Sequence, residues 1–450
     1  MKKVFLFSIV LSIMITMLSA CSRNTSSVEE ASAGNRAPAD TASKENATAT
    51  TESGTSISRD QVDMDSILTK LDKSLLSDYD YSKLKDKDIT LNVCNWGEYM
   101  AVNQDDYFDV NDEFEKLTGI NVNYKTFATN EELYSKLKSG GGDYDVVIPS
   151  DYMISKMKKE GLIQKLDFSN IPNFSYIDKK FVGLEYDPEN EYSVPYTWGI
   201  VCIVYNKTMV KKEITGWCDL WDEANDNNIL MFNNPRDAFG IALTYLGYSQ
   251  NTENRKELEE AASSLKQQKN LIQAYVMDEI FDKIGGGSSA IAPYYAGDVQ
   301  TMIDENSDLD FCIPKEGTNK FVDAICIPTA AKNKEAAEMY INFLNEIQIA
   351  YANCDYLCYS TPHTGVYNLF DNETKANPLR CPPDDYLNDK TEVFINLSDD
   401  TNAYTQELWN QIKIEKSKSP WLVPAFLLIS LALTFFLNIR RSRKKKQDIF

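Results

Sequence analysis

The chain has 450 residues, enough for two or three domains, and its hydrophobic content of 43% is ordinary for a globular protein. Its formal charge of −21 and its pI of about 4.6 argue against a nucleic-acid partner, because the phosphates would be repelled. The same acidity is compatible with a cationic ligand, although an acidic, well-solvated surface is the simpler explanation of the charge alone.

Residues 1–20 are predicted to be a secretory signal peptide, which takes no part in the fold. Lys2 and Lys3 precede an apolar stretch, and small residues follow it. The ending LSAC (18–21) resembles the lipobox of bacterial lipoproteins, in which the cysteine becomes the lipidated first residue. The alternative is an ordinary signal peptide with a cysteine by chance. We expect lipidation at Cys21.

Residues 21–88 are predicted to be a tether and lead-in to the fold. Ser, Thr, Ala and Asn dominate 22–60, so the segment has too few large apolar residues to offset the entropy of ordering. Residues 61–88 are expected to carry a short helix. Folded sequence is expected from about 89 to 415.

Four segments are predicted to be strands, at 89–94, 120–124, 144–148 and 200–205, and the second shows alternation of Ile120, Val122 and Tyr124 with polar residues. The run at 144–148 is apolar except for Asp145, and we expect it to be a strand that is buried on both faces.

Apolar residues at helical spacing predict helices between these strands. One helix is expected to end at Gly119, Asn130 to cap the next, another to begin at Asp151, and Asn234-Pro235 to open a fourth with proline at its first position. The apolar positions of the first two helices are Val110, Phe114 and Leu117, and Leu133 and Leu137. Buried stripes are expected at Phe239, Ala242, Leu243 and Leu246, and in a later helix at Ala337, Tyr340, Ile341 and Leu344.

The repeated β-α units predict an α/β architecture with largely parallel sheets. In such sheets, ligands bind beyond the carboxyl ends of the strands. Trp96, Glu98 and Tyr99 directly follow the strand at 89–94, so we expect them at such a site.

Residues 421–439 are almost uniformly apolar and are predicted to form a transmembrane helix, since about 20 residues span a bilayer. The positive-inside rule places the basic tail, 440–450, in the cytoplasm. The remainder is therefore expected outside the cell, held at the cell membrane through Cys21, the C-terminal span or both. The alternative is a buried core helix.

Eight further cysteines are expected to be mostly free, buried thiols, since several lie in apolar runs, although their number also permits disulfides in an oxidising compartment. Cys354 and Cys358 form the one close pair, and His363 is the sole histidine, so no metal site is expected. The sequence has no nucleophile elbow, no phosphate loop at 140–142 and no cofactor fingerprint. We therefore expect no catalytic residues and no cofactor.

Six segments share one design, in which an apolar strand is followed at once by aromatic or acidic residues. They are NWGEY (95–99), VVIPSDY (146–152), NNPRDAFG (233–240), APYYAGD (292–298), FVDAICIP (321–328) and YSTPHTG (359–365). Similar stretches between them are KEGLIQKLD (159–167), YSVPYTWG (192–199), LGYS (246–249) and AKNKEAAEMYINFL (331–344). Together they closely resemble the spermidine/putrescine-binding proteins of bacterial ABC importers. The resemblance covers about 89–415 and is specific because many segments occur in the right order.

The resemblance implies a two-lobed periplasmic-binding-protein fold of type II, with the ligand clamped in the cleft. Residues 89–198 and 324–367 would form lobe 1, and residues 199–323 and 368–415 would form lobe 2. The implied function is that of a receptor that captures putrescine or spermidine and delivers it to an ABC permease, whose ATPase is a separate chain.

The resemblance also implies the residues of the first lobe that bind the ligand. Trp96 and Tyr99 match cage aromatics, and Glu98 matches an acidic neighbour of one amine. Ser150 and Tyr152 match cleft residues. Each also has a simpler explanation, for example that Ser150 only caps the helix that begins at Asp151.

In the second lobe, Asn234 and Asp237 match two acidic positions, and Asp323 matches the aspartate that binds a ligand amine. Asn234 departs from the family because it replaces an expected carboxylate. The alternative for Asp237 is a purely structural pair with Arg236.

Tyr295 and Phe321 fall where the family commonly has tryptophans, and Tyr359 matches another cleft aromatic. The family's glutamine near the C-terminal end has no clear counterpart here, although it should fall in the region 393–397. These departures leave the choice between putrescine and spermidine open.

The chemistry of a polyamine agrees with such a cleft, because its ammonium groups need carboxylate partners and its methylenes and charges both suit aromatic faces. An enzyme, a membrane-anchored sensor and a receptor for another organic cation are the competing interpretations.

Overall fold

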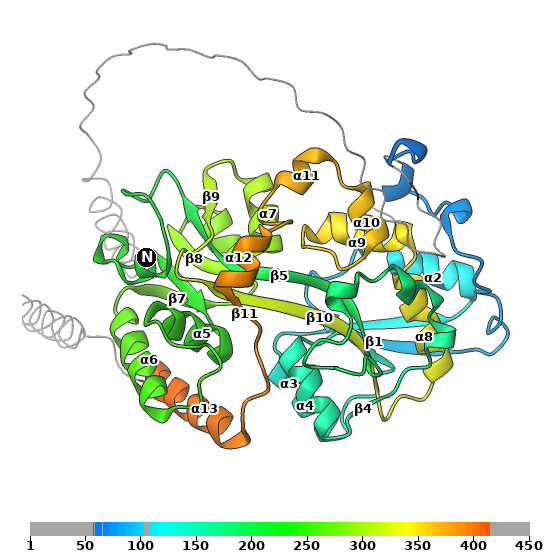
Figure 1. The fold of residues 1–450 in the computed structure, drawn as a ribbon, viewed down its shortest axis with the longest axis horizontal. Coiled ribbons are helices and arrows are strands. Elements are labelled where there is room, and N and C mark those ends of the chain that lie inside the picture. The colour runs from blue at the N-terminus through cyan, green and yellow to red at the C-terminus, as the bar shows by residue number, and fades with distance from the viewer. Residues whose placement is uncertain (1–56, 58, 65, 103–108, 415–450) are drawn as a thin grey trace, which may run out of the picture. The chain divides into compact units, whose positions relative to one another are not determined.

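Two long strands, β5 (Ser193–Asn206) and β10 (Thr318–Pro328), run antiparallel to each other through the middle of one mixed sheet (Figure 1). The sheet has the order β2-β1-β3-β10-β5-β8-β6-β7, while β4 and β11 pair with β10 and β9 pairs with β5. The pairing of β5 with β10 is irregular between Asp323 and Ala324. This computed structural model describes residues 57–414 without 58, 65 and 103–108, all within the compact unit Gly54–Phe450.

The other strands are β1 (Thr90–Trp96), β2 (Asn121–Phe127), β3 (Val146–Val147), β4 (Ile163–Gln164), β6 (Ile229–Phe232), β7 (Ile272–Val276), β8 (Ile291–Tyr295), β9 (Leu309–Cys312) and β11 (Thr391–Glu392). The helices are α2 (Val110–Thr118), α3 (Asn130–Lys138), α4 (Asp151–Lys159), α5 (Pro235–Tyr245), α6 (Arg255–Gln268), α7 (Ala296–Glu305), α8 (Lys334–Leu344), α9 (Ile347–Leu357), α10 (Thr364–Leu369), α11 (Asn372–Ala376), α12 (Asp384–Lys390) and α13 (Asp399–Ile414).

The predicted α/β class is confirmed, but the prediction of largely parallel sheets is wrong. Parallel pairing joins β1 to β2 and β3, and β6 to β7 and β8. The central pairs, β10 with β3 and β5, and β5 with β8 and β9, are antiparallel. Local β-α spacing predicts only neighbours that are joined by one helix, whereas β5 and β10 pair across more than 100 residues of chain.

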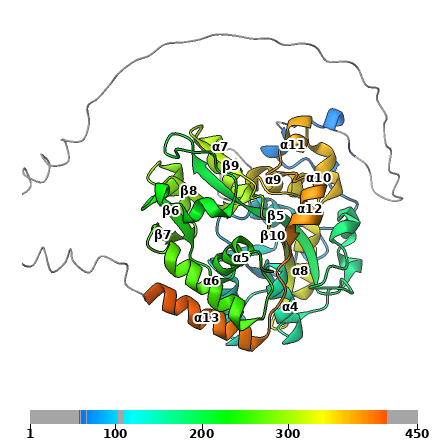
Figure 2. The ribbon, with the colours of Figure 1, turned by 60° about the vertical axis from the view of Figure 1, so that its left-hand side comes forward.

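The sheet carries two hydrophobic cores. The first core draws on residues between 71 and 198 and between 322 and 352, and the second on residues between 200 and 312 and between 379 and 412. Along β5, Trp198 belongs to the first core and Ile200 to the second. β5 therefore passes from one core to the other, while the buried apolar residues of β10 from Val322 to Ile327 belong to the first core. Figures 1 and 2 show α13 along α6 on the side of the second core.

The helices of the first core begin and end largely as their sequences predict. α2 ends at Gly119, whose φ of 75° is the left-handed conformation that glycine adopts most readily. The prediction that Asn130 caps α3 is wrong by one residue, because the Thr129 hydroxyl accepts the Glu132 N–H. Asn130 instead accepts the backbone N–H of Ser150 and donates to the Tyr152 hydroxyl.

α5 confirms the predicted opening at Asn234-Pro235, since the Asn234 side chain accepts the Arg236 N–H at 2.9 Å. Its buried stripe ends one turn earlier than predicted. Phe239, Ala242 and Leu243 are buried, but Leu246 is 36% exposed because the helix has ended there. The buried stripe predicted for α8 is confirmed at all four positions.

The segment 57–88 contains three short 3₁₀ turns, Arg59–Gln61, Ser66–Leu68 and Lys73–Leu75, rather than the predicted short helix. It packs on the helices after β10. Glu346, only 1% exposed, accepts the Ser77 N–H and the Ser77 and Tyr81 hydroxyls at 2.5–2.8 Å. The lead-in is therefore part of the folded unit.

The predicted signal peptide (1–20), Cys21, the predicted span (421–439) and the basic tail (440–450) lie outside the described residues. Within the part of the chain that the structure describes, none of the helices combines the length and apolar character needed to cross a membrane.

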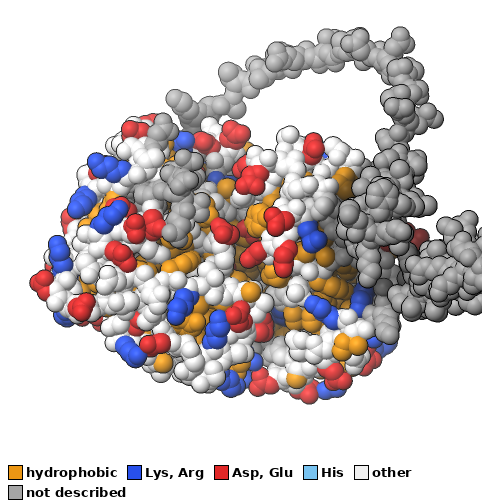
Figure 3. Space-filling model, turned by 180° about the vertical axis from the view of Figure 1, so that it is seen from behind, with side chains coloured by type: hydrophobic (Ala, Val, Ile, Leu, Met, Phe, Trp, Pro, Cys, Tyr) orange, Lys and Arg blue, Asp and Glu red, His pale blue; other side chains and the backbone are white. Residues whose placement is uncertain are grey.

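The eight cysteines of the described residues all carry free thiols. Four are buried and four are half-buried; they are Cys94, Cys202, Cys326 and Cys354, and Cys218, Cys312, Cys358 and Cys381, respectively. On the face seen in Figure 3, acidic and basic side chains are interspersed with small apolar patches.

Glu346→Ala is expected to lower the free energy of unfolding by about 2–4 kcal/mol, because it leaves three donors without their buried acceptor. Urea unfolding of the purified protein measures this. The matched control, Glu373→Ala in the exposed part of α11, should change the free energy by less than about 0.5 kcal/mol. Equal effects of the two changes would show that the lead-in contributes nothing to stability.

Candidate ligand-binding site

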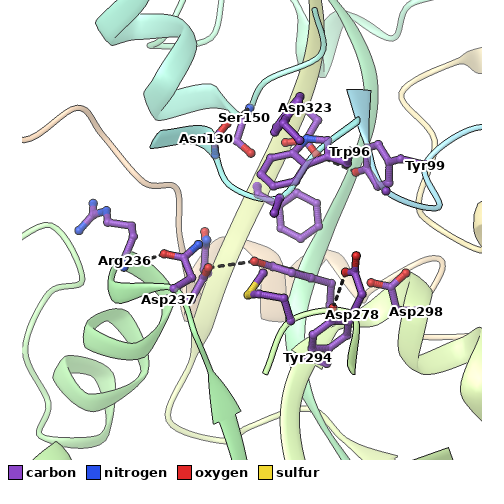
Figure 4. A pocket seen from close by; sticks show the side chains of 18 of the residues that line it. Trp96, Tyr99, Asn130, Ser150, Arg236, Asp237, Asp278, Tyr294, Asp298 and Asp323 are labelled. Carbon is purple, nitrogen blue, oxygen red and sulfur yellow. Dashed lines mark hydrogen bonds between the residues drawn. The ribbon is translucent and has the colours of Figure 1, made fainter. Parts of the chain in front are cut away.

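A pocket opens between the two cores, and the space within it and at its mouth amounts to about 840 Å³ (Figure 4). All eleven residues predicted from the sequence line it: Trp96, Glu98, Tyr99, Ser150, Tyr152, Asn234, Asp237, Tyr295, Phe321, Asp323 and Tyr359. Strand ends and helix starts bring them together. Trp96 ends β1, Asn234 caps α5, and Tyr295 ends β8.

Asp323 lies on β10, at the centre of the sheet, and is only 3% exposed. The Tyr99 hydroxyl donates to Oδ2 at 2.7 Å, while Oδ1 is buried without a hydrogen-bond partner. Burial raises the pKa of Asp323 to about 6, and the Tyr99 and Ser150 hydroxyls oppose that rise. Asp323 thus lines the pocket with one carboxylate oxygen that is available to a donor.

Asp237, in the first turn of α5, is held by the Tyr295 hydroxyl, which donates to Oδ2 at 2.9 Å. Burial raises the pKa of Asp237 to about 7, although the Tyr295 hydroxyl lowers it. The alternative of a structural pair with Arg236 is wrong. The Arg236 guanidinium donates to Gln250 O and Asn251 Oδ1 and stacks on the Phe394 ring at 4.1 Å.

Two further tyrosine–aspartate pairs were not predicted. The Tyr359 hydroxyl donates to Asp298 Oδ2 at 2.8 Å, and the Tyr294 hydroxyl lies 3.5 Å from Asp278 Oδ1. Burial raises the pKa of Asp298 to about 7 and also raises that of Asp278. Gly297 is needed for the first pair, because a Cβ there would lie 2.2 Å from the Tyr359 ring.

The sequence carried a signal for only one of these two aspartates. Asp298 ends the segment APYYAGD, which follows the same strand-then-acid design as the predicted site residues. Asp278 lies in a turn after β7 and is brought to the pocket only by the tertiary fold.

Aromatic rings form a continuous wall of the pocket. Tyr295 packs against Phe321 at 5.5 Å between ring centroids, Phe321 against Tyr359 at 6.0 Å, and Tyr359 against Tyr99 at 5.5 Å. Trp96 packs on Phe127 at 4.6 Å, and its Nε1 is buried without a hydrogen-bond partner.

The remaining predicted residues have partners in the fold. Ser150 is the N-cap residue of α4, but its side chain makes no capping bond, so the purely structural explanation fails for its hydroxyl. Tyr152 donates to Glu131 and accepts from Asn130. Asn234 lines the pocket and at the same time caps α5.

Other lining residues also escaped prediction. Asp151 is 1% exposed, and burial raises its pKa to about 8. Two backbone N–H groups donate to the carboxylate and oppose this rise. The region 393–397, expected to supply a glutamine, instead places Phe394 in the pocket.

Six carboxylates therefore line one pocket: Glu98, Asp151, Asp237, Asp278, Asp298 and Asp323. Arg236 is the one basic side chain among the described residues that line it. A site with this charge attracts cations and repels phosphates, and its aromatic wall suits a ligand with apolar segments.

Residues 110–382 match the bacterial extracellular solute-binding proteins. The chain belongs to this family. This solute-binding protein is 36% identical over 326 residues to the spermidine/putrescine-binding periplasmic protein of Salmonella typhimurium, a match that covers 72% of this chain and 91% of the relative.

Solved structures agree with the family assignment. The spermidine/putrescine ABC transporter substrate-binding protein of Streptococcus pneumoniae is 35% identical with a TM-score of 0.62, and the match covers 72% of this chain and 99% of that one. The Tp0655 lipoprotein of Treponema pallidum is 27% identical with a TM-score of 0.64 over 72% of this chain and 99% of its own. The periplasmic-binding-protein fold expected from the sequence is confirmed.

Asp237 is expected to make the ligand-free protein less stable as the pH rises. Its pKa is near 4 in the unfolded chain and about 7 in the fold, so the folded protein binds more protons between these values and stability falls with rising pH. Asp237→Asn removes this dependence. From pH 5 to pH 8, the free energy of unfolding of the variant should rise by about 2–3 kcal/mol relative to that of the wild type. Urea unfolding at the two pH values measures this.

Because the same variant is measured at two pH values, any effect of the introduced amide on stability that does not depend on pH cancels. A constant difference between variant and wild type would mean that Asp237 is ionised throughout.

Proposed function

We propose that this solute-binding protein captures a polyamine, putrescine or spermidine, in the acidic, aromatic pocket and delivers it to an ABC permease. The observation that carries the proposal is the pocket itself, in which tyrosines hold carboxylates beside a continuous aromatic wall.

The pocket offers each part of a polyamine a suitable partner. A charge-assisted hydrogen bond between an ammonium and a carboxylate contributes about 1.5–3 kcal/mol net, and an aromatic face contributes about 0.5–2 kcal/mol towards a cation. Asp323 Oδ1 is buried without a partner, so an ammonium there would satisfy it. The methylenes between ammonium groups would pack on Phe321 and its neighbouring rings.

The relatives support the same ligand class, since their names record binding of spermidine and putrescine, and a relative in Pseudomonas aeruginosa that is 30% identical is named for putrescine. We propose that the eleven residues predicted from the sequence bind the ligand, and that Asp278 and Asp298 act with them.

Binding would close the lobes 89–198 with 324–367 and 199–323 with 368–415 around the ligand. The change from one core to the other near residue 199 of β5 supports the boundary at that point. The permease and its ATPase would be separate chains. Cys21 and residues 421–439, which lie outside the described residues, would anchor the receptor at the membrane and raise its effective concentration beside the permease.

Titration calorimetry of the purified protein with putrescine and spermidine tests the proposal. We expect micromolar or tighter binding of at least one of them. Asp323→Asn should weaken that binding at least tenfold, because an amide cannot replace the charge that faces the ammonium.

The matched control is Asp226→Asn, at an exposed position outside the pocket, which should leave the affinity within twofold. Absence of heat and of tryptophan fluorescence change with either amine would overturn the proposed function.

Affinity is also expected to rise at least tenfold between pH 5.5 and pH 8. The ammonium groups have pKa values near that of lysine and keep their charge across this range, whereas Asp323, Asp237 and Asp298 lose protons near pH 6–7. Binding below pH 7 therefore expels protons. Calorimetry in buffers of different ionisation enthalpy counts these protons, and an affinity that is independent of pH would contradict the raised pKa values.

A further inference from the structure

Gly199 lies on β5 between Trp198 of the first core and Ile200 of the second. The antiparallel register places Phe321 of β10 directly opposite it, at the centre of the sheet (Figure 1). A third segment joins the two strands there, because the Trp198 N–H donates to Ser360 O at 3.1 Å. Three segments of the chain therefore meet at Gly199, at the point where β5 passes from one core to the other.

Two aromatic rings pack directly against the backbone of Gly199. A Cβ at residue 199 would lie 2.9 Å from Phe321 Cζ and 3.3 Å from Tyr359 Cδ1. The other edge of the Tyr359 ring lies against Gly297, where a Cβ would be 2.2 Å from Cδ2. The two glycines therefore leave a slot for the Tyr359 ring, and Gly199 alone also leaves room for the tip of the Phe321 ring.

The two rings belong to a small buried cluster that is separate from both cores. Its buried members are at most 7% exposed; they are Tyr99, Phe321, Leu357 and Tyr359. Three of the four, all but Leu357, line the pocket and form part of its aromatic wall. A displacement of the rings at Gly199 would therefore move the wall itself.

The backbone conformation does not require glycine at residue 199, since Gly199 is not among the residues with positive φ. Alanine would in general be the more stable choice inside a strand, because glycine loses more conformational entropy on folding and packs no side chain. Glycine within a strand often marks a place where another group approaches the backbone closely. The contacts with the two rings are thus the physical reason for glycine at this position.

We propose that Gly199 is a positioning residue for ligand binding, whose missing side chain lets the rings of Phe321 and Tyr359 rest on β5 where it crosses between the cores. The inference rests on the proposed function. Gly199 acts through the two rings and not by contact with the ligand. An added methyl group would displace the rings from the surface on which the methylenes of the ligand pack.

The experiment is titration calorimetry of the full protein with putrescine and spermidine, together with urea unfolding of each variant. Gly199→Ala should weaken the binding of both amines at least fivefold. The matched control is Gly285→Ala, because no atom lies within 4 Å of an added Cβ there. The control should leave both affinities within twofold.

A second arm of the experiment repeats the change in a Phe321→Leu background. Phe321→Leu alone should weaken binding, since a ring is lost from the wall. Adding Gly199→Ala should then cost less than a further twofold, because leucine lacks the Cζ atom that lies nearest to the added methyl group. An effect that does not act through the ring would be the same in both backgrounds.

The outcomes separate this inference from the proposed function. A wild type that binds neither amine refutes the proposed function and, with it, the role of Gly199 in binding. A wild type that binds, with a Gly199→Ala variant of equal affinity or with equal losses in the two backgrounds, refutes the role of Gly199 and leaves the proposed function intact.

Should Gly199→Ala alone fail to fold, the double variant decides. A folded double variant that binds as tightly as Phe321→Leu supports the role of Gly199, and a double variant that remains unfolded overturns it.

Discussion

The carboxylates that share one pocket without basic partners are the constraint on which the rest of the structure depends. Elsewhere in the described fold, some buried acids accept several hydrogen bonds. Asp145, for example, accepts three backbone N–H groups, from Asn92, Lys332 and Asn333. Inside the pocket, Asp237 and Asp298 are each held by one tyrosine hydroxyl, and burial raises the pKa of both to about 7. In the ligand-free pocket, these carboxylates therefore have no positively charged partner among the described residues, and a bound cation would supply one.

Tyrosine is well suited to holding a carboxylate in such a pocket. Its ring supplies apolar surface and a face for a cation, and its hydroxyl fixes one carboxylate oxygen without neutralising the charge. Tyr295 has both roles, since its ring packs against Phe321 while its hydroxyl donates to Asp237. The aromatic wall and the carboxylates are therefore parts of one hydrogen-bonded arrangement.

The two long central strands make this arrangement possible. β5 contributes to both cores, and β10, which pairs with it, carries Phe321 and Asp323 close to the point where β5 passes between them. Residues from both sides of the cleft then converge on the same space, as the approach of Asp278 to Gly97 shows. Such a site is built from both halves of the fold, as the proposed closure around a ligand requires.

The sequence by itself determined the features that depend on near neighbours along the chain. The end of α2 at Gly119, the opening of α5 at Asn234-Pro235 and the buried stripe of α8 follow from capping and periodicity. The eleven pocket residues could be predicted from strand-end motifs and from their resemblance to a known family.

Only the tertiary structure decided what depends on contacts between distant segments. These features include the antiparallel pairing of β5 with β10, the docking of the lead-in on Glu346, and the presence of Asp278 in the pocket. The physical reason is that local patterns report the conformation of a few residues, whereas strand pairing and the meeting of charges are set by packing across the whole fold.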